Sequence, residues 1–311
     1  MKCVLCNNTN FEIISSKIRH NIPRKVISCK KCTLTCLENP EKNLVDYKKS
    51  YRKKHSPILG QILTPVEFHK FSTEIFQKRL SRIESLLKSN SSVLEIGSST
   101  GHFLQLIKDR VSDCTGIELD KKFADFAKNK LNLNIYKKPL EKIDFQGKKF
   151  DIIFMFQVLE HIPKPLELLQ LCKKILKPKG KIYVEVPNLD DALLSIYSIS
   201  EFQKFYFRAP HVYYYNKKTL FKIMKKSGFN GKVKTIQEYS VYNHINWIQN
   251  EIPQTDQKIG YSPLKWNYEN SNNLHKAKKM EKWFEKFNQE YKEQMEKLDL
   301  GEHVSFLGQK N

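Results

Sequence analysis

The chain has 311 residues and a formal net charge of +21, a length that suits one large domain or two ordinary ones. Hydrophobic residues make up 40% of the sequence and aromatic residues 12%, which is enough to build a core and excludes a disordered chain. No apolar run approaches the roughly 18 residues that a membrane span requires, and the first residues lack the apolar segment of a secretion signal. We therefore expect a cytoplasmic protein without a membrane span.

The positive charge invites nucleic-acid binding, but the kind of basic residue argues against it. Only seven of the 54 basic residues are arginines, and the other 47 are lysines scattered along the chain. Bidentate contacts to bases and phosphates favour arginine, whereas lysine suits any solvated surface. A small-molecule partner is therefore expected, with nucleic acid as the weaker alternative.

Four cysteines near the start of the chain form two pairs with C-x2-C spacing. They are Cys3, Cys6, Cys29 and Cys32. Two such pairs bring four thiolates to one tetrahedral Zn²⁺, and short strands are expected between the pairs at 11–14 and 25–28. A disulfide is disfavoured without a secretion signal, and a redox motif should open a helix after a strand. The sequence therefore predicts a structural zinc ribbon over 1–40, with Cys36 as a weaker competing ligand.

Alternating elements follow the ribbon. Residues 41–90 indicate a polar connector and then an amphipathic helix at 65–87, because apolar residues recur there at helical spacing. From residue 91 onward strands and helices alternate, which predicts a doubly wound, Rossmann-like α/β domain with a seven-stranded, mostly parallel sheet over 91–311. Its expected strands lie at 92–97, 114–118, 133–136, 150–156 and 181–186, and its helices at 102–110, 121–131 and 165–176.

The last part of the chain has a different pattern. Expected strands at 231–240 and 303–307 flank a helical insertion at about 241–300, which precedes the last strand. Its long helix carries an apolar stripe that we expect to pack on the protein's own core, because the heptads are too few for a coiled coil. The stripe consists of Ala277, Met280, Phe284, Phe287, Tyr291 and Leu298.

The segment 93–104 places the pattern E-x-G-x-x-x-G at the end of the first strand of this domain. Gly97 and Gly101 permit a tight turn in which the backbone approaches a ligand. Ser99 stands where a dinucleotide-binding motif has its middle glycine, so the backbone of this turn is poorly suited to binding a pyrophosphate. The charge of Glu95 is unfavourable beside a pyrophosphate and favourable beside a sulfonium and an ammonium group.

A second acidic residue follows the next strand. Glu118 lies twenty-one residues after Gly97, where a carboxylate can accept hydrogen bonds from both ribose hydroxyls. Leu119 follows it and is expected against an adenine face. The strand, turn, helix, strand and acid in register together predict a nucleoside-containing cofactor.

With the segments 150–161, 176–180 and 185–188, these motifs resemble the class I S-adenosylmethionine-dependent methyltransferases. That resemblance implies that the methionine part of the cofactor lies against the first turn and the end of the family's fourth strand, here 150–156. The cofactor-binding residues that it implies are Glu95, Gly97, Ser98, Gly101, Glu118, Leu119 and Gln157.

The four-cysteine ribbon and the segments 210–220, 226–229 and 239–247 resemble a subgroup acting on sugars and cell-surface glycan precursors. This resemblance implies methyl transfer to a nucleotide-activated sugar or polysaccharide precursor. One alternative is a tRNA or rRNA methyltransferase that uses the ribbon and the lysines to hold RNA. The other is a non-catalytic protein that binds the cofactor without turnover.

Two histidines are candidate catalytic bases. Methyl transfer is an in-line displacement in which the protein aligns the acceptor and, for a hydroxyl or acidic carbon, removes a proton. His211 follows the fifth strand on the ligand-binding side of an open sheet, and a resemblance to sugar C-methyltransferases favours it; the alternative is a structural histidine. His161, in the pair Glu160-His161, is the second candidate base. Some quinone-pathway relatives bind a metal beside such a pair through an additional Glu, but Gln157 occupies that position, so no metal is expected there.

Overall fold

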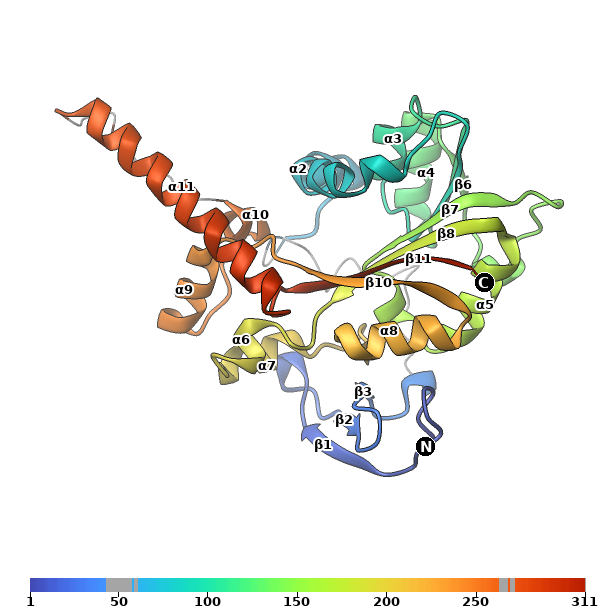
Figure 1. Ribbon diagram of the computed structural model, residues 1–311, viewed down its shortest axis with the longest axis horizontal. Helices are drawn as coiled ribbons and strands as arrows, with labels where there is room; N and C mark the ends of the chain where they lie inside the picture. Colours follow the sequence, from blue (N-terminus) through green and yellow to red (C-terminus); the bar gives the residue numbers. More distant parts are fainter. Residues whose placement is uncertain (43–57, 59–60, 263–267, 269–271, 311) are drawn as a thin grey trace.

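The computed structural model describes residues 1–42, 58, 61–262, 268 and 272–310. A central sheet has helices on both faces, and a small N-terminal sheet packs beside it (Figure 1). Most of the expected connector, at 43–57 and 59–60, lies outside the described residues, as do parts of the segment at 263–271.

Seven strands form the central sheet: β4 (Ser92–Ile96), β5 (Asp113–Ile117), β6 (Asn134–Tyr136), β7 (Phe150–Phe156), β8 (Leu176–Pro187), β10 (Phe229–Ile236) and β11 (His303–Lys310). Their order is β10-β11-β8-β7-β4-β5-β6. The five strands from β4 to β8 run parallel, whereas β11 is antiparallel to both β8 and β10. The expected seven-stranded, mostly parallel sheet is confirmed.

Among the described residues, five helices cover this sheet: α2 (Pro65–Ile83), α3 (His102–Ile107), α4 (Lys121–Leu131), α5 (Pro165–Ile175) and α8 (Lys217–Lys226). Helices α2, α3 and α4 lie on one face, and α5 and α8 on the other (Figure 1). Each helix buries apolar residues at helical spacing; in α8 these are Leu220, Ile223 and Met224. Burial of one apolar stripe per helix produces two hydrophobic cores, one on each side of the sheet.

The N-terminal sheet consists of β1 (Phe11–Ser15), β2 (Val26–Cys29), β3 (Thr35–Leu37) and β9 (Tyr213–Tyr214), in that order. The two expected ribbon strands are confirmed as β1 and β2. The sequence did not indicate β3 and β9, which have three and two residues and are too short to show a periodic pattern. Since β9 belongs to the larger domain, the N-terminal sheet is shared between distant parts of the chain.

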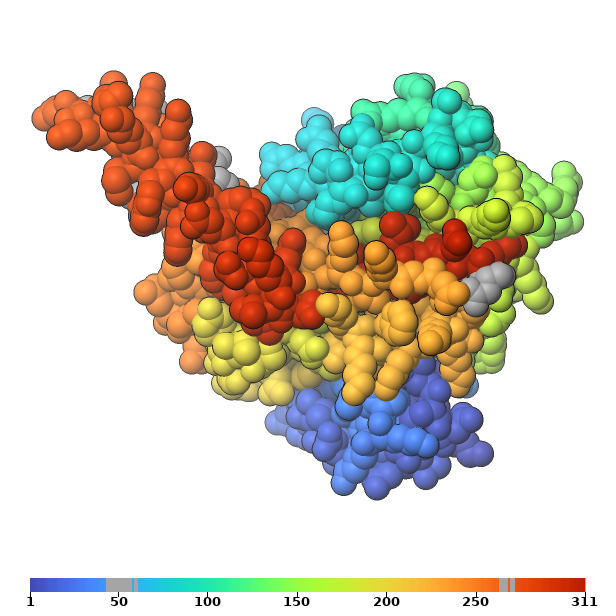
Figure 2. All heavy atoms as spheres, in the orientation of Figure 1, coloured from blue at the N-terminus to red at the C-terminus, as the bar shows by residue number. Residues whose placement is uncertain are grey.

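The segments that follow β8 and β10 are helical: α6 (Ala192–Ser195), α7 (Ser200–Tyr206), α9 (Val241–Asn250), α10 (Gln257–Tyr261) and α11 (Leu274–Lys297). The last three form the expected insertion, and α11 projects from the body of the molecule (Figures 1 and 2). The expectation that its stripe packs on the core is wrong for Met280, Phe287 and Leu298, which are exposed. Only Asn288 and Met295 are buried in α11, because its C-terminal half is the part that packs against the body. No described helix, α11 included, combines the length and apolarity that crossing a membrane requires.

Candidate functional site

Strand β4 ends in a turn that depends on two glycines. Gly97 and Gly101 have φ angles of 78° and 73°, which other residues rarely adopt. A Cβ atom at Gly97 would lie 2.5 Å from Val158 Cγ2, and one at Gly101 would lie 2.5 Å from Leu133 Cδ1. The turn therefore lies close to Val158, after β7, and to Leu133, where a side chain at either position would not fit.

Two buried polar groups at this turn have atoms without a hydrogen-bond partner among the described residues, Glu95 Oε2 and Ser98 Oγ. Burial raises the pKa of Glu95 well above 4.5, although the nearby charge of Arg79 opposes that shift. An orphaned, buried carboxyl group is stabilised by a cation placed against it. The residues present therefore fit the ammonium and sulfonium of S-adenosylmethionine.

Glu118 lies directly after β5, beside the same turn. Its Oε2 accepts a hydrogen bond from the Ser99 backbone N–H at 2.8 Å, and its Oε1 accepts one from Asp120 at 2.7 Å. Glu118 thus links the glycine turn after β4 to the segment that follows β5. The half-buried Leu119 is next in the chain, and Gln157 lies at the end of β7. The roles of these residues towards a cofactor remain predictions.

The structure brings Glu160 together with both candidate bases. His161 Nε2 lies 3.7 Å from Glu160 Oε1, and His211 Nε2 lies 4.0 Å from the same oxygen. The two imidazole rings meet edge to face with centroids 4.8 Å apart. Burial raises the pKa of Glu160 to about 8, and neither of its carboxyl oxygens has a hydrogen-bond partner among the described residues. Three proton-exchanging groups therefore share one buried site just after β7.

Hydrogen bonds define which nitrogen of each histidine carries a proton. A carbonyl only accepts, so His161 Nδ1 donates to the Pro210 carbonyl at 2.9 Å, and Nε2 is its basic nitrogen. A guanidinium only donates, so His211 Nε2 accepts from Arg208 Nε and Nη2 at 2.9 and 2.7 Å. The basic nitrogen of His211 is thus engaged by a cation, whereas that of His161 faces a carboxyl group.

The N-terminal sheet supports the loop that carries His211. The Leu37 backbone N–H donates to the Val212 carbonyl at 3.0 Å, and the Val212 N–H donates to the Glu160 carbonyl at 2.8 Å. Cys36 in β3 pairs directly with Tyr213 in β9. The histidine pair therefore lies between the end of β7 and the ribbon.

The four paired cysteines lie together. Cys3 Sγ is 3.4 Å from Cys32 Sγ, Cys6 Sγ is 3.5 Å from Cys29 Sγ, and all four sulfur atoms are within 4.8 Å of one another. A Zn²⁺ with four thiolates at about 2.3 Å holds its sulfurs about 3.8 Å apart, so this donor set fits a tetrahedral zinc ion. Cys36 is buried but does not belong to the group.

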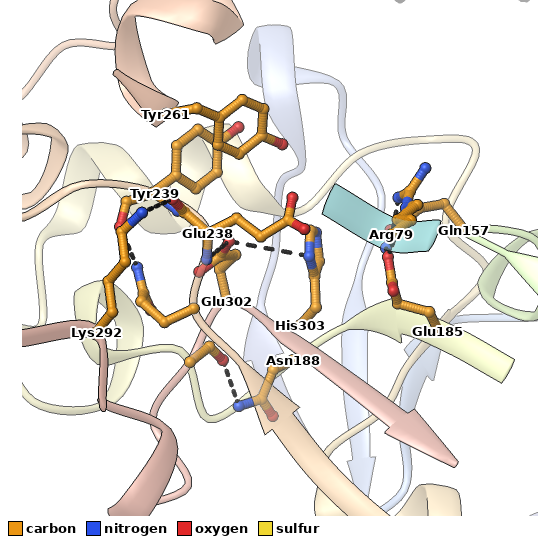
Figure 3. A network of polar contacts seen from close by, with 12 residues as sticks. Arg79, Gln157, Glu185, Asn188, Glu238, Tyr239, Tyr261, Lys292, Glu302 and His303 are labelled. Carbon is orange, nitrogen blue, oxygen red and sulfur yellow. Dashed lines mark hydrogen bonds and ion pairs between the residues drawn. The ribbon is translucent and has the colours of Figure 1, made fainter. Parts of the chain in front are cut away.

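Figure 3 shows a network of charged groups near the carboxyl ends of β8 and β10 and the start of β11. The fully buried Glu185 accepts hydrogen bonds from Arg79 Nε at 3.0 Å and Gln157 Nε2 at 3.5 Å. Arg82 pairs with both Glu185 and Glu238. Although burial raises the pKa of Glu185, neighbouring positive charges led by Arg79 lower it to about 2. Sequence reasoning missed this network; the only signal was a pair of arginines, scarce in this chain, on one face of an amphipathic helix.

The far end of this network holds Glu238, Glu302 and His303 (Figure 3). Glu302 Oε1 accepts the Glu238 and Tyr239 backbone N–H groups at 2.6 and 3.1 Å. The three side chains are close enough to share a cation, but the Arg82 guanidinium already occupies Glu238. The Arg82 guanidinium therefore already supplies positive charge at this end of the network.

Residues 68–233 match the family model described as a methyltransferase domain, and the chain belongs to that family. It is 28% identical over 116 residues to the ubiquinone biosynthesis O-methyltransferase of Coxiella burnetii (strain RSA 493 / Nine Mile phase I), covering 35% of this chain and 50% of that protein. The corresponding protein of Haemophilus ducreyi is 27% identical over 106 residues, covering 31% of this chain and 45% of its own. The chain spans about half the length of the curated relatives it matches.

A solved structure has the same fold. The phosphoethanolamine N-methyltransferase 2 of Haemonchus contortus, in complex with S-adenosyl-L-methionine, aligns with a TM-score of 0.50 and 17% identity. The alignment covers 79% of this chain and 57% of that one. These comparisons support a Rossmann-like methyltransferase domain and leave the acceptor open.

Proposed function

We propose that this protein transfers a methyl group from S-adenosylmethionine to a small molecule whose reacting group must lose a proton. The observation that carries the proposal is the buried cluster of Glu160, His161 and His211 directly beyond β7. It follows Val158, the residue that packs against the Gly97 turn. A proton acceptor is thus held beside the place where the family binds its methyl donor.

Each residue of the cofactor side has a defined task in this proposal. Glu95 and Gln157 hold the ammonium end of the methionine part, Glu118 accepts the ribose hydroxyls, and Leu119 packs against the adenine. The cofactor supplies a methyl carbon already activated by its sulfonium. The protein has only to orient the acceptor in line, exclude water and remove a proton.

His161 is the stronger of the two candidate bases. Its Nε2 is directed towards Glu160, whereas the corresponding nitrogen of His211 accepts hydrogen bonds from Arg208. In this arrangement His211 packs against His161 and orients it. Both assignments follow from hydrogen-bond direction, and both are tested by the variants described in the Discussion.

The acceptor class is proposed from sequence motifs alone. The segments 210–220 and 239–247 favour a nucleotide-activated sugar or polysaccharide precursor. The curated relatives act by name in ubiquinone biosynthesis, which makes a phenol the second candidate acceptor. RNA is the third, favoured only by the lysine-rich surface.

Binding and transfer experiments test this proposal. Calorimetry with S-adenosylhomocysteine should show binding, and labelled S-adenosylmethionine should be offered with nucleotide sugars, catechol-type phenols and RNA. Transfer to a nucleotide sugar supports the full proposal, and transfer to a phenol replaces its acceptor class. Absence of cofactor binding would overturn it, and steeply salt-dependent transfer to RNA would identify a nucleic-acid enzyme.

We also propose that Cys3, Cys6, Cys29 and Cys32 bind one structural Zn²⁺, which leaves no open position for catalysis. Metal analysis of the freshly purified protein should find one zinc per chain, lost in Cys29→Ser. Cys36→Ser is the matched control, because Cys36 is buried in the same ribbon outside the cluster. Chelation should expose the first forty residues to protease while the central sheet stays folded. Zinc retained in Cys29→Ser but lost in Cys36→Ser would assign the ligands differently.

A further inference from the structure

Helix α11 projects from the body (Figures 1 and 2) and carries exposed aromatic and apolar side chains. Met280, Trp283 and Phe287 are 47%, 55% and 40% exposed. Their spacing of three, four and seven residues places them on one side of the helix. The Trp283 and Phe287 rings stack with their centroids 6.0 Å apart, so they present one continuous apolar surface, which we call the α11 patch.

Positive charge surrounds this patch. The first ten residues of α11, Leu274 to Trp283, contain four lysines and one glutamate. Lys276 and Lys279 precede Trp283 by seven and four residues, which places them on the same side of the helix as the ring. All four lysines are exposed. Further along, Glu285, Glu290 and Glu293 balance the lysines, so the basic charge is concentrated at the projecting end.

The charge favours an anionic occupant over a second copy of the chain. Two chains that each carry +21, meeting at their lysine-rich ends, would repel each other. The described part of the chain does not cover the patch either, since Met280, Trp283 and Phe287 are all exposed. Exposed apolar patches of this kind mark interaction sites.

A helix that exposes lysines beside tryptophan and phenylalanine is suited to the interface of an anionic bilayer. The position of α11 also favours a flat surface as the partner. Because the helix projects from the body, its exposed side can lie on a membrane. Its other end is attached to the body, so a groove on another protein could not enclose the whole helix. We propose that the α11 patch, with Lys276, Lys279 and Lys282, docks this protein onto an anionic lipid surface. This proposal does not depend on the proposed methyl transfer.

The test uses the full chain and two kinds of vesicle, one of phosphatidylcholine alone and one of phosphatidylcholine and phosphatidylglycerol in equal parts. Sedimentation with the vesicles should occur only with phosphatidylglycerol and should weaken as salt rises, because the attraction is partly electrostatic. Trp283→Ser combined with Phe287→Ser should reduce vesicle binding about tenfold or more. Lys279→Glu combined with Lys282→Glu should cause a similar loss.

The matched control is Ile196→Ser, which removes an equally exposed apolar side chain outside α11 and should leave vesicle binding unchanged. Circular dichroism and S-adenosylhomocysteine affinity verify that each variant is folded. Failure to bind phosphatidylglycerol vesicles would overturn the proposal, as would equal losses in the control and the Trp283/Phe287 variant. Sedimentation equilibrium tests the remaining possibility. If the unmodified protein forms a dimer without binding vesicles, and the Trp283/Phe287 variant is monomeric, the patch binds a second copy of the chain.

Discussion

The proposed cofactor side and the proposed acceptor side of this molecule are assembled in different ways. The cofactor side uses short segments at the ends of adjacent strands, with Gly97, Gly101 and Glu118 within some twenty residues of one another. The proposed acceptor side brings the end of β7 and the loop at 208–211 together, and the charged network beside it joins α2, β8 and the start of β11. In that network the ion pair between Arg79 and Glu185 joins residues 106 positions apart.

This difference has a physical cause. A turn that must admit a ligand against its backbone imposes glycine at fixed positions, and the restriction is local. A buried ion pair or a histidine pair requires only that the tertiary fold bring its members together, and it imposes no spacing along the chain. The two sides should therefore respond differently to substitution, and four changes test this.

The largest effect is expected at the histidine pair. His161→Ala should lower turnover about 10²–10⁴-fold, the range typical of losing a positioned base, while S-adenosylhomocysteine affinity stays nearly unchanged. His211→Ala should reduce turnover less, because its Nε2 accepts from Arg208. Steady-state kinetics with the acceptor found in the transfer screen measures both variants.

The pH dependence of kcat/KM distinguishes a catalytic base from a histidine that is needed only for packing. The logarithm of kcat/KM in the unmodified protein should rise with pH up to an apparent pKa, and His161→Ala should lose that limb. If His211→Ala abolishes turnover and His161→Ala retains it, His211 is the base. If both variants remain active, the acceptor needs no base.

The next effect is on folding. Arg79→Leu should lower the free energy of unfolding by about 3–5 kcal/mol, because it leaves the buried Glu185 carboxylate without its main partner. Lys25→Ala is the matched control, since Lys25 pairs with Glu38 on the surface and should contribute less than about 1 kcal/mol. Urea denaturation measures both. Equal effects would show that the network in Figure 3 is not a structural element.

A smaller effect is expected on the cofactor side. Glu118→Ala should weaken S-adenosylhomocysteine binding by about 1–3 kcal/mol, the cost of leaving buried ribose hydroxyls unpaired. Glu118→Gln, which retains one acceptor oxygen, should lose less. Titration calorimetry compares the three proteins, and unchanged affinity in Glu118→Ala would remove Glu118 from the ribose site.

The smallest change concerns the charge of Glu160. Its pKa is raised from 4.5 to about 8 by burial, so between these pH values the folded protein holds a proton that the unfolded chain has released. Stability from this group therefore falls as pH rises through that window. Glu160→Gln should be more stable than the unmodified protein by about 1–2 kcal/mol at pH 8, with little difference near pH 4.5. Thermal unfolding at both pH values checks the sign, and a pH-independent difference would contradict it.

The insertion and the ribbon illustrate how much of the structure could be predicted from the sequence. Strands β1 and β2 in the ribbon and the long helix α11 in the insertion lie where they were expected, because strand and helix patterns are local signals. The sequence did not predict how α11 packs, because the apolar stripe at 277–298 has the same pattern whether it faces a core or solvent. In the structure Met295 is buried and Met280 is exposed, although both belong to the same helix.

The sequence by itself determined the order of the elements, the glycine turn after β4, the acid after β5 and the four-cysteine cluster. Each depends on a conformational or coordination requirement that acts over a short span and admits few residue types. Only the tertiary structure decided that Arg79 neutralises Glu185, that Glu160 joins His161 and His211, and that β3 pairs with β9. Those contacts depend on where strands end in space, and many sequences with the same local patterns could place different side chains there.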